Sequence, residues 1–189
     1  MAVLVSGGAG YIGSHMVLEL LDRGEKVVVL DNLSTGFWWA VPSEAIFVQG
    51  DIGNQELVEG LIGEYDITEI AHFAARIVVP ESVTDPLGYY FNNTVKTRAL
   101  IESAARKGVK HVIFSSTAAV YGEPPVSPVP EEIALNPINP YGRSKLMSEW
   151  MLQDAAKAHG FTYIALRYFN VSGADPKGRS GQSSPNATH

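Results

Sequence analysis

The amino-acid sequence predicts an α/β protein, a Rossmann-type doubly wound parallel sheet. Short apolar segments alternate with amphipathic segments along most of the 189 residues, as in parallel strands joined by crossover helices. The first apolar segment also leads directly into a glycine-rich turn and a helical pattern, as in dinucleotide-binding sheets. This length and a hydrophobic content of 46% suffice for one main domain with a substantial core.

Six strands are expected, because six short segments are continuously apolar. Segments of this kind suit a sheet that is covered on both faces. They span residues 3–6, 26–31, 46–50, 69–73, 111–115 and 162–167.

Four helices are expected between these strands, and three of them end at a glycine. Gly24, Gly108 and Gly160 each follow a basic residue, and a glycine at that place is a C-terminal stop signal. The expected helices span residues 11–23, 55–62, 87–107 and 140–159.

Two long loops remain, at residues 32–44 and 121–139. Ordered loops of this length are commonly functional. The second loop carries residues that neither a helix nor a central strand accepts, namely Pro124, Pro125, Pro128, Pro130 and Pro137.

Composition and charge exclude several classes of function. A net charge of -6 gives no broad attraction to nucleic acid or to an anionic membrane. The chain has no cysteine and its five histidines lack ligand spacing, so disulfides, thiolate catalysis and a zinc site are not expected. The apolar start at residues 2–5 is too short for a signal peptide or a membrane span, and a cytoplasmic location is the expectation.

Residues 7–13 form a candidate phosphate-binding loop with the sequence Gly-Gly-Ala-Gly-Tyr-Ile-Gly. The loop joins the first strand to the first helix, where backbone amides and the helix N-terminus can hold a pyrophosphate. Gly7 and Gly10 leave room for the turn and for a close cofactor, and Gly13 lets the helix pack near the sheet. Taken alone, the segment is equally consistent with a glycine-rich turn that binds nothing.

Two acidic residues after later strands strengthen this prediction. Asp31 ends the second strand, where a carboxylate can accept hydrogen bonds from the adenosine ribose. A 2′-phosphate would meet like charge there and Asn32 offers no cation, so NAD is favoured over NADP. Asp51, after the third strand, is a candidate for binding the adenine amino group. The alternatives are a strand-ending carboxylate at Asp31 and a turn cap at Asp51.

Tyr141 and Lys145 form a candidate acid–base pair, because residues four apart lie on one face of a helix. A free tyrosine has a pKa of about 10, and a cation at roughly 4 Å stabilises a phenolate by about 4 kcal/mol at an effective dielectric of about 20. Lys145 and a positively charged nicotinamide would therefore bring the pKa of Tyr141 toward neutrality, with desolvation opposing them. Thr117 follows a strand end and can bridge the substrate oxygen and the Tyr141 phenol, with Ser115 and Ser116 as weaker candidates. Taken alone, the Tyr-x-x-x-Lys spacing also fits a solvated helix face.

On these residues the chain resembles the extended short-chain dehydrogenase/reductases of the NAD-dependent epimerase/dehydratase family, and within them the UDP-glucose 4-epimerases. The glycine loop and the Tyr-x-x-x-Lys motif are typical of the broad family. The neighbouring segments, above all Arg-Tyr-Phe-Asn at residues 167–170, favour the epimerase branch. The resemblance covers essentially the whole chain through residues 7–15, 30–33, 50–52, 72–75, 86–90, 114–117, 120–122, 140–145 and 166–170.

The resemblance implies a tightly held NAD that oxidises C4 of a UDP-hexose and then reduces the 4-keto sugar from its other face, interconverting UDP-glucose and UDP-galactose. Tyr141 would take the C4 hydroxyl proton, Thr117 would assist, and Lys145 would tune Tyr141 and bind the cofactor. Asn170 would contact the UDP-sugar together with Thr117 and Tyr141. The implied NAD site comprises Gly7, Gly10, Tyr11, Ile12, Gly13, Asp31, Asn32, Ser34, Asp51, Ile52, Phe73, Ala74, Ala75, Asn92, Ser115, Tyr141, Lys145 and Phe169.

Two local features differ from patterns in the family. Related dehydratases carry an acidic residue after the catalytic threonine, whereas Ala118 and Ala119 follow Thr117 here, which disfavours dehydration. Well-known epimerases carry a lysine near the cofactor phosphates, where this chain has Ile77 beside Arg76.

Members of the family also continue into a smaller substrate domain, so the chain is expected to be an N-terminal part. Residues 1–170 would form the NAD-binding domain with the catalytic residues, and residues 171–189 a loop toward the substrate domain. The alternatives to an epimerase are an NAD-dependent reductase or decarboxylase on another nucleotide sugar and a nucleotide-binding module with little turnover. The expected partners are a UDP-hexose and a second copy of the chain, without nucleic acid or membrane.

Overall fold

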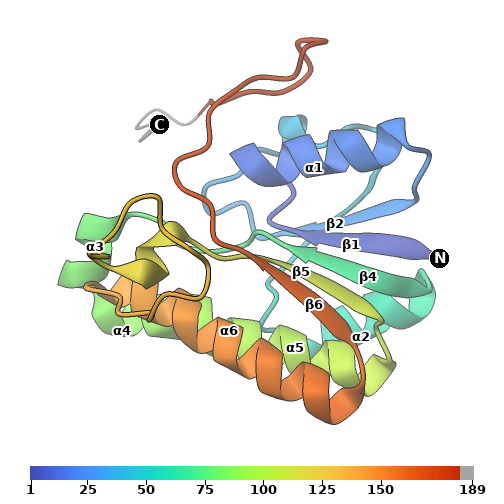
Figure 1. Cartoon of the computed structure of the whole chain (residues 1–189). Helices are drawn as coiled ribbons and strands as arrows, with labels where there is room; N and C mark the ends of the chain where they lie inside the picture. The colour runs from blue at the N-terminus through green and yellow to red at the C-terminus, as the bar shows by residue number, and fades with distance from the viewer. Residues whose placement is uncertain (184–189) are drawn as a thin grey trace.

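The computed structural model describes residues 1–183, and their six strands form one open sheet (Figure 1). All neighbouring strands are parallel, in the order β3-β2-β1-β4-β5-β6. This is the strand order of the Rossmann fold, so the predicted fold class is confirmed. The predicted strands agree with the observed ones to within two residues at each end: β1 Ala2–Ser6, β2 Val27–Asp31, β3 Ile46–Gln49, β4 Ile67–His72, β5 His111–Ser115 and β6 Thr162–Leu166.

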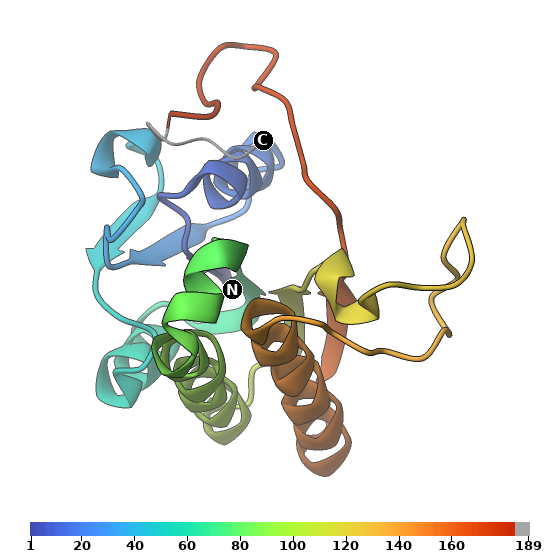
Figure 2. The ribbon, with the colours of Figure 1, turned by 90° about the vertical axis from the view of Figure 1, so that its left-hand side faces the viewer.

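The helices form one layer on each side of the sheet, as Figures 1 and 2 both show. Helix α1 (Tyr11–Asp22) covers one face, while α2 (Gln55–Glu64), α5 (Lys96–Lys107) and α6 (Pro140–His159) cover the other. Within the described part of the chain, no helix is both long and apolar enough to cross a membrane.

The helix predicted at residues 87–107 is divided in the structure. It consists of α4 (Pro86–Tyr89), a π-helical turn (Tyr90–Val95) and α5. The structure also contains α3 (Val79–Thr84) and two short 3-10 turns, Trp38–Ala40 and Ala118–Tyr121, none of which was predicted. Such short segments lack the helical periodicity that a sequence prediction requires.

Two hydrophobic cores hold these layers together. In the larger core Leu4, Ile70 and Phe114 of the sheet pack among residues of α2, α5 and α6. In the smaller core Val5 and Val29 pack with residues of α1 on the opposite face. A fully buried side chain of this size contributes about 1.5–3 kcal/mol, so the cores supply most of the stabilisation of the sheet.

The outer strands are not covered on both faces, contrary to the prediction. Ile164 in β6 is 59% exposed, and Leu166 at the end of the same strand is also exposed. β3 at the other edge is only half-buried. The exposed side of β6 belongs to the face of the sheet that α1 covers. Among the described residues, α1 is the one α-helix on that face, and it contacts β1 and β2 rather than β6.

Helix α6 begins and ends where the sequence predicts. The Asn139 side chain accepts a hydrogen bond of 2.8 Å from the Gly142 amide, and Pro140 occupies the first turn. Gly108 and Gly160 are left-handed C-caps, with φ of +73° and +75°. Gly24 instead follows the C-cap of α1, with φ of +80°.

Two loop regions differ in where they lie. The predicted proline-rich loop projects from the body of the molecule beyond α6 (Figure 2). The segment after β6 returns across α1, where the Tyr11 hydroxyl donates to the Gly173 carbonyl at 2.7 Å (Figure 1). Arg179 on the same segment pairs with Asp22 at the end of α1, at 2.8 Å.

We expect Asn139→Ala to lower the free energy of unfolding by about 1 kcal/mol, because it removes the acceptor for the Gly142 amide at the start of α6. Asn139→Asp keeps the acceptor and should retain nearly all of the stability. Urea unfolding of the three proteins measures both effects. Equal stability of the alanine variant and the wild type would contradict the capping role.

Candidate active site

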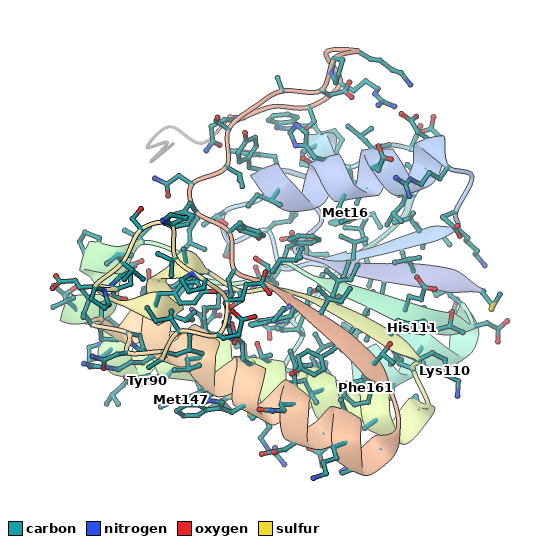
Figure 3. The ribbon with its side chains drawn as sticks, in the orientation of Figure 1. Met16, Tyr90, Lys110, His111, Met147 and Phe161 are labelled. Atoms are coloured by element: carbon teal, nitrogen blue, oxygen red, sulfur yellow. The ribbon has the colours of Figure 1, made fainter. Side chains whose placement is uncertain are left out.

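The predicted functional residues meet at the carboxyl edge of the sheet. Gly7 follows β1, Asp31 ends β2, Phe73 follows β4 and Ser115 ends β5. Figure 3 labels His111 at the start of β5, which marks the opposite edge. The order of the strands reverses between β1 and β4, and open α/β sheets bind their ligands at such a switch point.

At two positions of the glycine loop, Gly7 and Gly13, the backbone leaves no room for any residue other than glycine. Gly7 has φ of +75°, and a Cβ there would lie 2.5 Å from the Ala74 nitrogen. A Cβ on Gly13 would lie 2.1 Å from the Gly7 carbonyl oxygen. Gly10 is the N-cap of α1, so the loop leads directly to a helix N-terminus. The loop therefore has the geometry that pyrophosphate binding requires.

Asp31 is buried and connects the glycine loop with the loop that follows β2. One carboxylate oxygen accepts from the Ala9 amide at 3.0 Å, and the other accepts from the Leu33 amide at 2.8 Å. A carboxylate has about four lone-pair sites, so these two bonds leave capacity for ribose hydroxyls. Asn32 in turn accepts from the Ser34 amide at 3.0 Å, which orders the start of this loop.

Asp51 lies beside Asn32 and is engaged by a lysine. It accepts from Lys96 at 2.5 Å, from the Gly53 amide at 2.8 Å and from Asn32 at 3.2 Å. Burial raises the pKa of Asp51, but the hydrogen bonds from Lys96 and Gly53 outweigh burial and hold this pKa below its ordinary value. The neighbouring Ile52 is buried in the larger core. Lys96 was missed because nothing in its local sequence connects it with residue 51.

The segment after β4 is hydrogen-bonded to the end of β1. The amides of Phe73 and Ala74 both donate to the Ser6 carbonyl, at 2.8 and 3.1 Å. Asn92, which was predicted to bind the cofactor, donates to the Asn93 side chain at 3.0 Å. Asn93 itself is buried, and its side chain bonds the backbone of Arg76 and the Ser144 hydroxyl. This role of Asn93 was also missed, because the sequence does not distinguish two adjacent asparagines.

Arg76 does not replace the missing lysine in this structure. Its guanidinium pairs with Glu81 and Asp85 and lies 4.7 Å from the centroid of the Tyr89 ring. The adjacent Ile77 is half exposed. Both ion pairs of the Arg76 guanidinium are thus made with carboxylates of the chain itself.

The structure brings the three predicted catalytic residues together. The Thr117 side chain is hydrogen-bonded to the Tyr141 phenol. Lys145, only 2% exposed, donates to the Ser115 carbonyl at 2.7 Å. Its ammonium also lies 4.9 Å from the centroid of the Phe114 ring, a cation–π contact. Lys145 therefore does not lie on a solvated helix face.

Burial dominates the electrostatics of this cluster. It lowers the pKa of Lys145 to about 7, because the charged ammonium is removed from water. Burial also raises the pKa of Tyr141, and the hydrogen bond from Thr117 only partly opposes that shift. Burial thus holds the pKa of Tyr141 above its ordinary value in the chain alone. The lowering by Lys145 together with a nicotinamide charge stays a prediction for the chain with bound cofactor.

The proline-rich loop and Phe169 border an open cavity of about 390 Å³ next to the catalytic segment. Phe169 and Asn170, the predicted cofactor and substrate contacts, are both exposed. The cavity is lined by Ala118, Tyr121, Gly122, Pro124, Pro125, Val126, Ser127, Val129 and Phe169.

The strand order, the glycine loop, and Tyr141 with the buried Lys145 on α6 define the chain as a dinucleotide-binding protein of the Rossmann class. A model of the NAD dependent epimerase/dehydratase family matches residues 3–187, and the chain belongs to this family.

Comparisons with individual proteins agree with this membership. The chain is 52% identical over 187 residues to a UDP-glucose 4-epimerase of Azospirillum brasilense, covering 99% of this chain and 54% of that protein. The crystal structure of UDP-glucose 4-epimerase from Brucella ovis in complex with NAD superposes with a TM-score of 0.96 at 48% identity, covering 100% of this chain and 57% of the other. The enzyme from Bifidobacterium longum in complex with NAD+ and UDP superposes with a TM-score of 0.92 at 36% identity, covering 98% and 58%. The chain thus spans about half the length of the relatives it matches.

We expect Lys145→Met to remove a pH dependence of stability. The pKa of Lys145 is about 7 in the folded chain and about 10.4 in an unfolded one, so the folded chain binds fewer protons between these values. The stability that depends on Lys145 is complete above the unfolded pKa and is lost as the pH falls toward the folded pKa, at about 1.4 kcal/mol per pH unit.

Urea unfolding of both proteins from about pH 7 to about pH 10 measures this difference. The wild type should gain stability relative to the variant as the pH rises. Parallel stability curves would show that Lys145 is not buried as described.

Proposed function

We propose that the chain is the cofactor-binding and catalytic part of a 4-epimerase that interconverts UDP-glucose and UDP-galactose by transient oxidation at C4. The observation that carries the proposal is the cluster that Tyr141 forms with the buried Thr117 and Lys145 at the same edge of the sheet as the glycine loop. The names of the relatives supply the class of substrate.

The residues present fit a bound NAD. The glycine loop and the N-terminus of α1 would hold its pyrophosphate, and the remaining acceptor sites of Asp31 would bind the adenosine ribose. Asn32, Ser34 and Asp51 would surround the adenosine, while Phe73 to Ala75, Asn92, Ser115 and Phe169 would line the rest of the cofactor site. When bound, NAD supplies the hydride acceptor and a positive charge on its nicotinamide.

The chain's own residues would move one proton during each oxidation or reduction of the sugar. Tyr141 accepts the proton of the C4 hydroxyl as the hydride leaves C4, and it returns that proton when the hydride is delivered to the other face. Thr117 hydrogen-bonds Tyr141 and orients the substrate oxygen. Lys145, anchored by the Ser115 carbonyl, contributes a positive charge when it is protonated, and Asn170 contacts the UDP-sugar. Net oxidation is zero after both halves.

We propose the division into domains that the sequence implies: residues 1–170 bind the cofactor and carry catalysis, and residues 171–189 lead toward a substrate domain. Residues 184–189 of that segment lie outside the described part of the chain. The 189 residues alone are expected to bind NAD but to turn over slowly, because substrate orientation is worth about 7 to 11 kcal/mol in well-positioned reactants. The 189 residues alone would then act mainly as a nucleotide-binding module, while the longer protein would be the epimerase.

Two further proposals concern assembly and location. Exposed apolar residues gather where α6 meets α4 and the π-helical turn, and Figure 3 shows Tyr90 and Met147 close together there. We propose that this patch pairs with a second copy of the chain; it comprises Leu87, Phe91, Val95, Met147 and Trp150. We also propose a cytoplasmic location, in line with residues 2–5 being buried in β1.

We expect the chain to bind NAD at least about tenfold more tightly than NADP, because a 2′-phosphate would be repelled by Asp31 and a tenfold difference corresponds to only about 1.4 kcal/mol. Calorimetric titration of both dinucleotides measures the ratio. Tighter binding of NADP would reject the assignment of Asp31 to the ribose.

Tyr141→Phe should reduce epimerase turnover by roughly 100-fold to 10,000-fold, because it removes the group that transfers the proton. NAD affinity should change little, since the ring and its surroundings remain. Turnover is measured as conversion of UDP-galactose to UDP-glucose, in the 189-residue chain and in the chain extended to the length of its relatives. Near-wild-type turnover of the variant would exclude Tyr141 as the base.

Trp150→Glu should shift the chain from dimer to monomer, because it places a charge in the proposed apolar interface. The matched control is Trp38→Glu, which changes an exposed tryptophan on the loop after β2. Analytical ultracentrifugation distinguishes the species. A monomeric wild type, or equal dissociation in both variants, would contradict the proposed interface.

A further inference from the structure

The segment that carries Thr117 is held by residues outside the catalytic cluster. Ser115 shares a short hydrogen bond with the Tyr168 hydroxyl, and the Ala118 amide donates to the Tyr168 carbonyl at 3.0 Å. Between them, the Ser116 hydroxyl donates to Glu149. Three residues of one short segment are therefore fixed from the end of β6 and from α6.

Glu149 is itself held by an arginine fork. The Arg167 Nε lies 3.1 Å from both carboxylate oxygens of Glu149, and a terminal guanidinium nitrogen donates to Oε2 at 2.7 Å. The other terminal nitrogen donates to the Tyr121 hydroxyl at 3.3 Å and to the Glu131 carbonyl at 3.2 Å. One guanidinium thus joins α6, β6 and the proline-rich loop in a fixed geometry.

The position of Glu149 connects this fork with the catalytic lysine. Glu149 follows Lys145 by four residues on α6, so both side chains leave the same face of the helix. Both are buried, Glu149 being 6% exposed. Lys145 donates to the Ser115 carbonyl, while Glu149 accepts from the next residue, Ser116. A shift of the Ser115–Ser116 peptide would therefore displace the acceptor of the lysine.

Energetics favour a geometric role for the fork over a stabilising one. The desolvation of two buried charges offsets most of their mutual attraction, so such a pair is weak evidence for stability. A bidentate arginine–carboxylate pair does, however, define orientation as well as distance.

We propose that Glu149 and Arg167 are positioning residues, which act through Ser116 to fix the Ser115 carbonyl against Lys145 and the backbone of Thr117. This inference rests on the proposed function, in which Tyr141, Thr117 and Lys145 carry the chemistry. Neither Glu149 nor Arg167 needs to touch the substrate or the cofactor.

Two conservative variants separate the Ser116–Glu149 hydrogen bond from the Arg167–Glu149 ion pair. Ser116→Ala removes the hydroxyl that joins the segment to Glu149 and leaves the ion pair intact. Arg167→Lys keeps the positive charge but loses the planar fork. The control is Glu19→Gln, which breaks the exposed pair of Glu19 with Arg23 on α1.

Amide hydrogen exchange of the 189-residue chain tests the positioning itself. In both variants, exchange in residues 115–119 should be faster by about tenfold, the equivalent of about 1.4 kcal/mol, while exchange in α1 and in the rest of α6 stays unchanged. Unchanged exchange in residues 115–119, or an equal increase throughout α6 and β6, would overturn the proposal. Ser116→Ala decides the outcome if Arg167→Lys does not fold.

Turnover of the chain extended to the length of its relatives tests the consequence for catalysis. Both variants should lose roughly 10-fold to 100-fold in kcat, with KM and the Kd for NAD nearly unchanged, because the misplaced groups act in the transition state. A raised KM with unchanged kcat, or an equal loss in Glu19→Gln, would overturn the proposal. Absence of turnover in the extended wild-type chain would refute the proposed function instead, and the exchange measurement would then decide the positioning role alone.

Discussion

A parallel sheet brings the carboxyl ends of all its strands to one edge, and the rest of the site depends on this constraint. Gly7, Asp31, Phe73 and Ser115 are far apart in the chain, yet each follows or ends a strand of the same sheet. The two hydrophobic cores fix the strands in register, so they also fix the relative positions of these residues. Helix α6 then adds Tyr141 and Lys145 from the layer below.

The candidate catalytic cluster is costly to fold, because it contains a buried ammonium and a partly buried phenol. The pKa of Lys145 is lowered by burial, and the pKa of Tyr141 is raised by burial, so each residue is displaced from its ordinary ionisation. Perturbed groups of this kind gather at functional sites, where their environment serves the reaction rather than stability. The Ser115 carbonyl and the Phe114 ring offset part of the cost for Lys145.

Much of the fold could be predicted from the sequence, because its signals are local. Continuous apolar segments indicated all six strands, and Asn139, Pro140 and Gly160 bound α6 with short-range capping chemistry. The spacing of Tyr141 and Lys145, the candidate catalytic pair, along that helix likewise required no knowledge of tertiary structure. The glycine loop was recognisable because it lies between a strand and a helix, a context that the sequence itself displays.

Features that depend on distant partners could not be predicted. The pairing of Arg167 with Glu149 and that of Lys96 with Asp51 join residues far apart in the sequence. The exposure of Ile164 depends on which helices cover each face of the sheet, and no local pattern states this. The raised pKa of Tyr141 likewise follows from burial, whose extent only the packed structure determines.

The most direct test of this account is a titration of the Tyr141 phenol by ultraviolet difference absorbance, comparing the wild type with Tyr141→Phe in the absence and presence of NAD. In the free chain the pKa of Tyr141 should lie above that of an ordinary tyrosine, because burial raises it. Binding of NAD should lower this pKa, since the nicotinamide charge adds to that of Lys145. A chain that binds NAD and leaves the Tyr141 pKa unchanged would contradict the central claim that the cofactor and the cluster of Tyr141, Thr117 and Lys145 form one site.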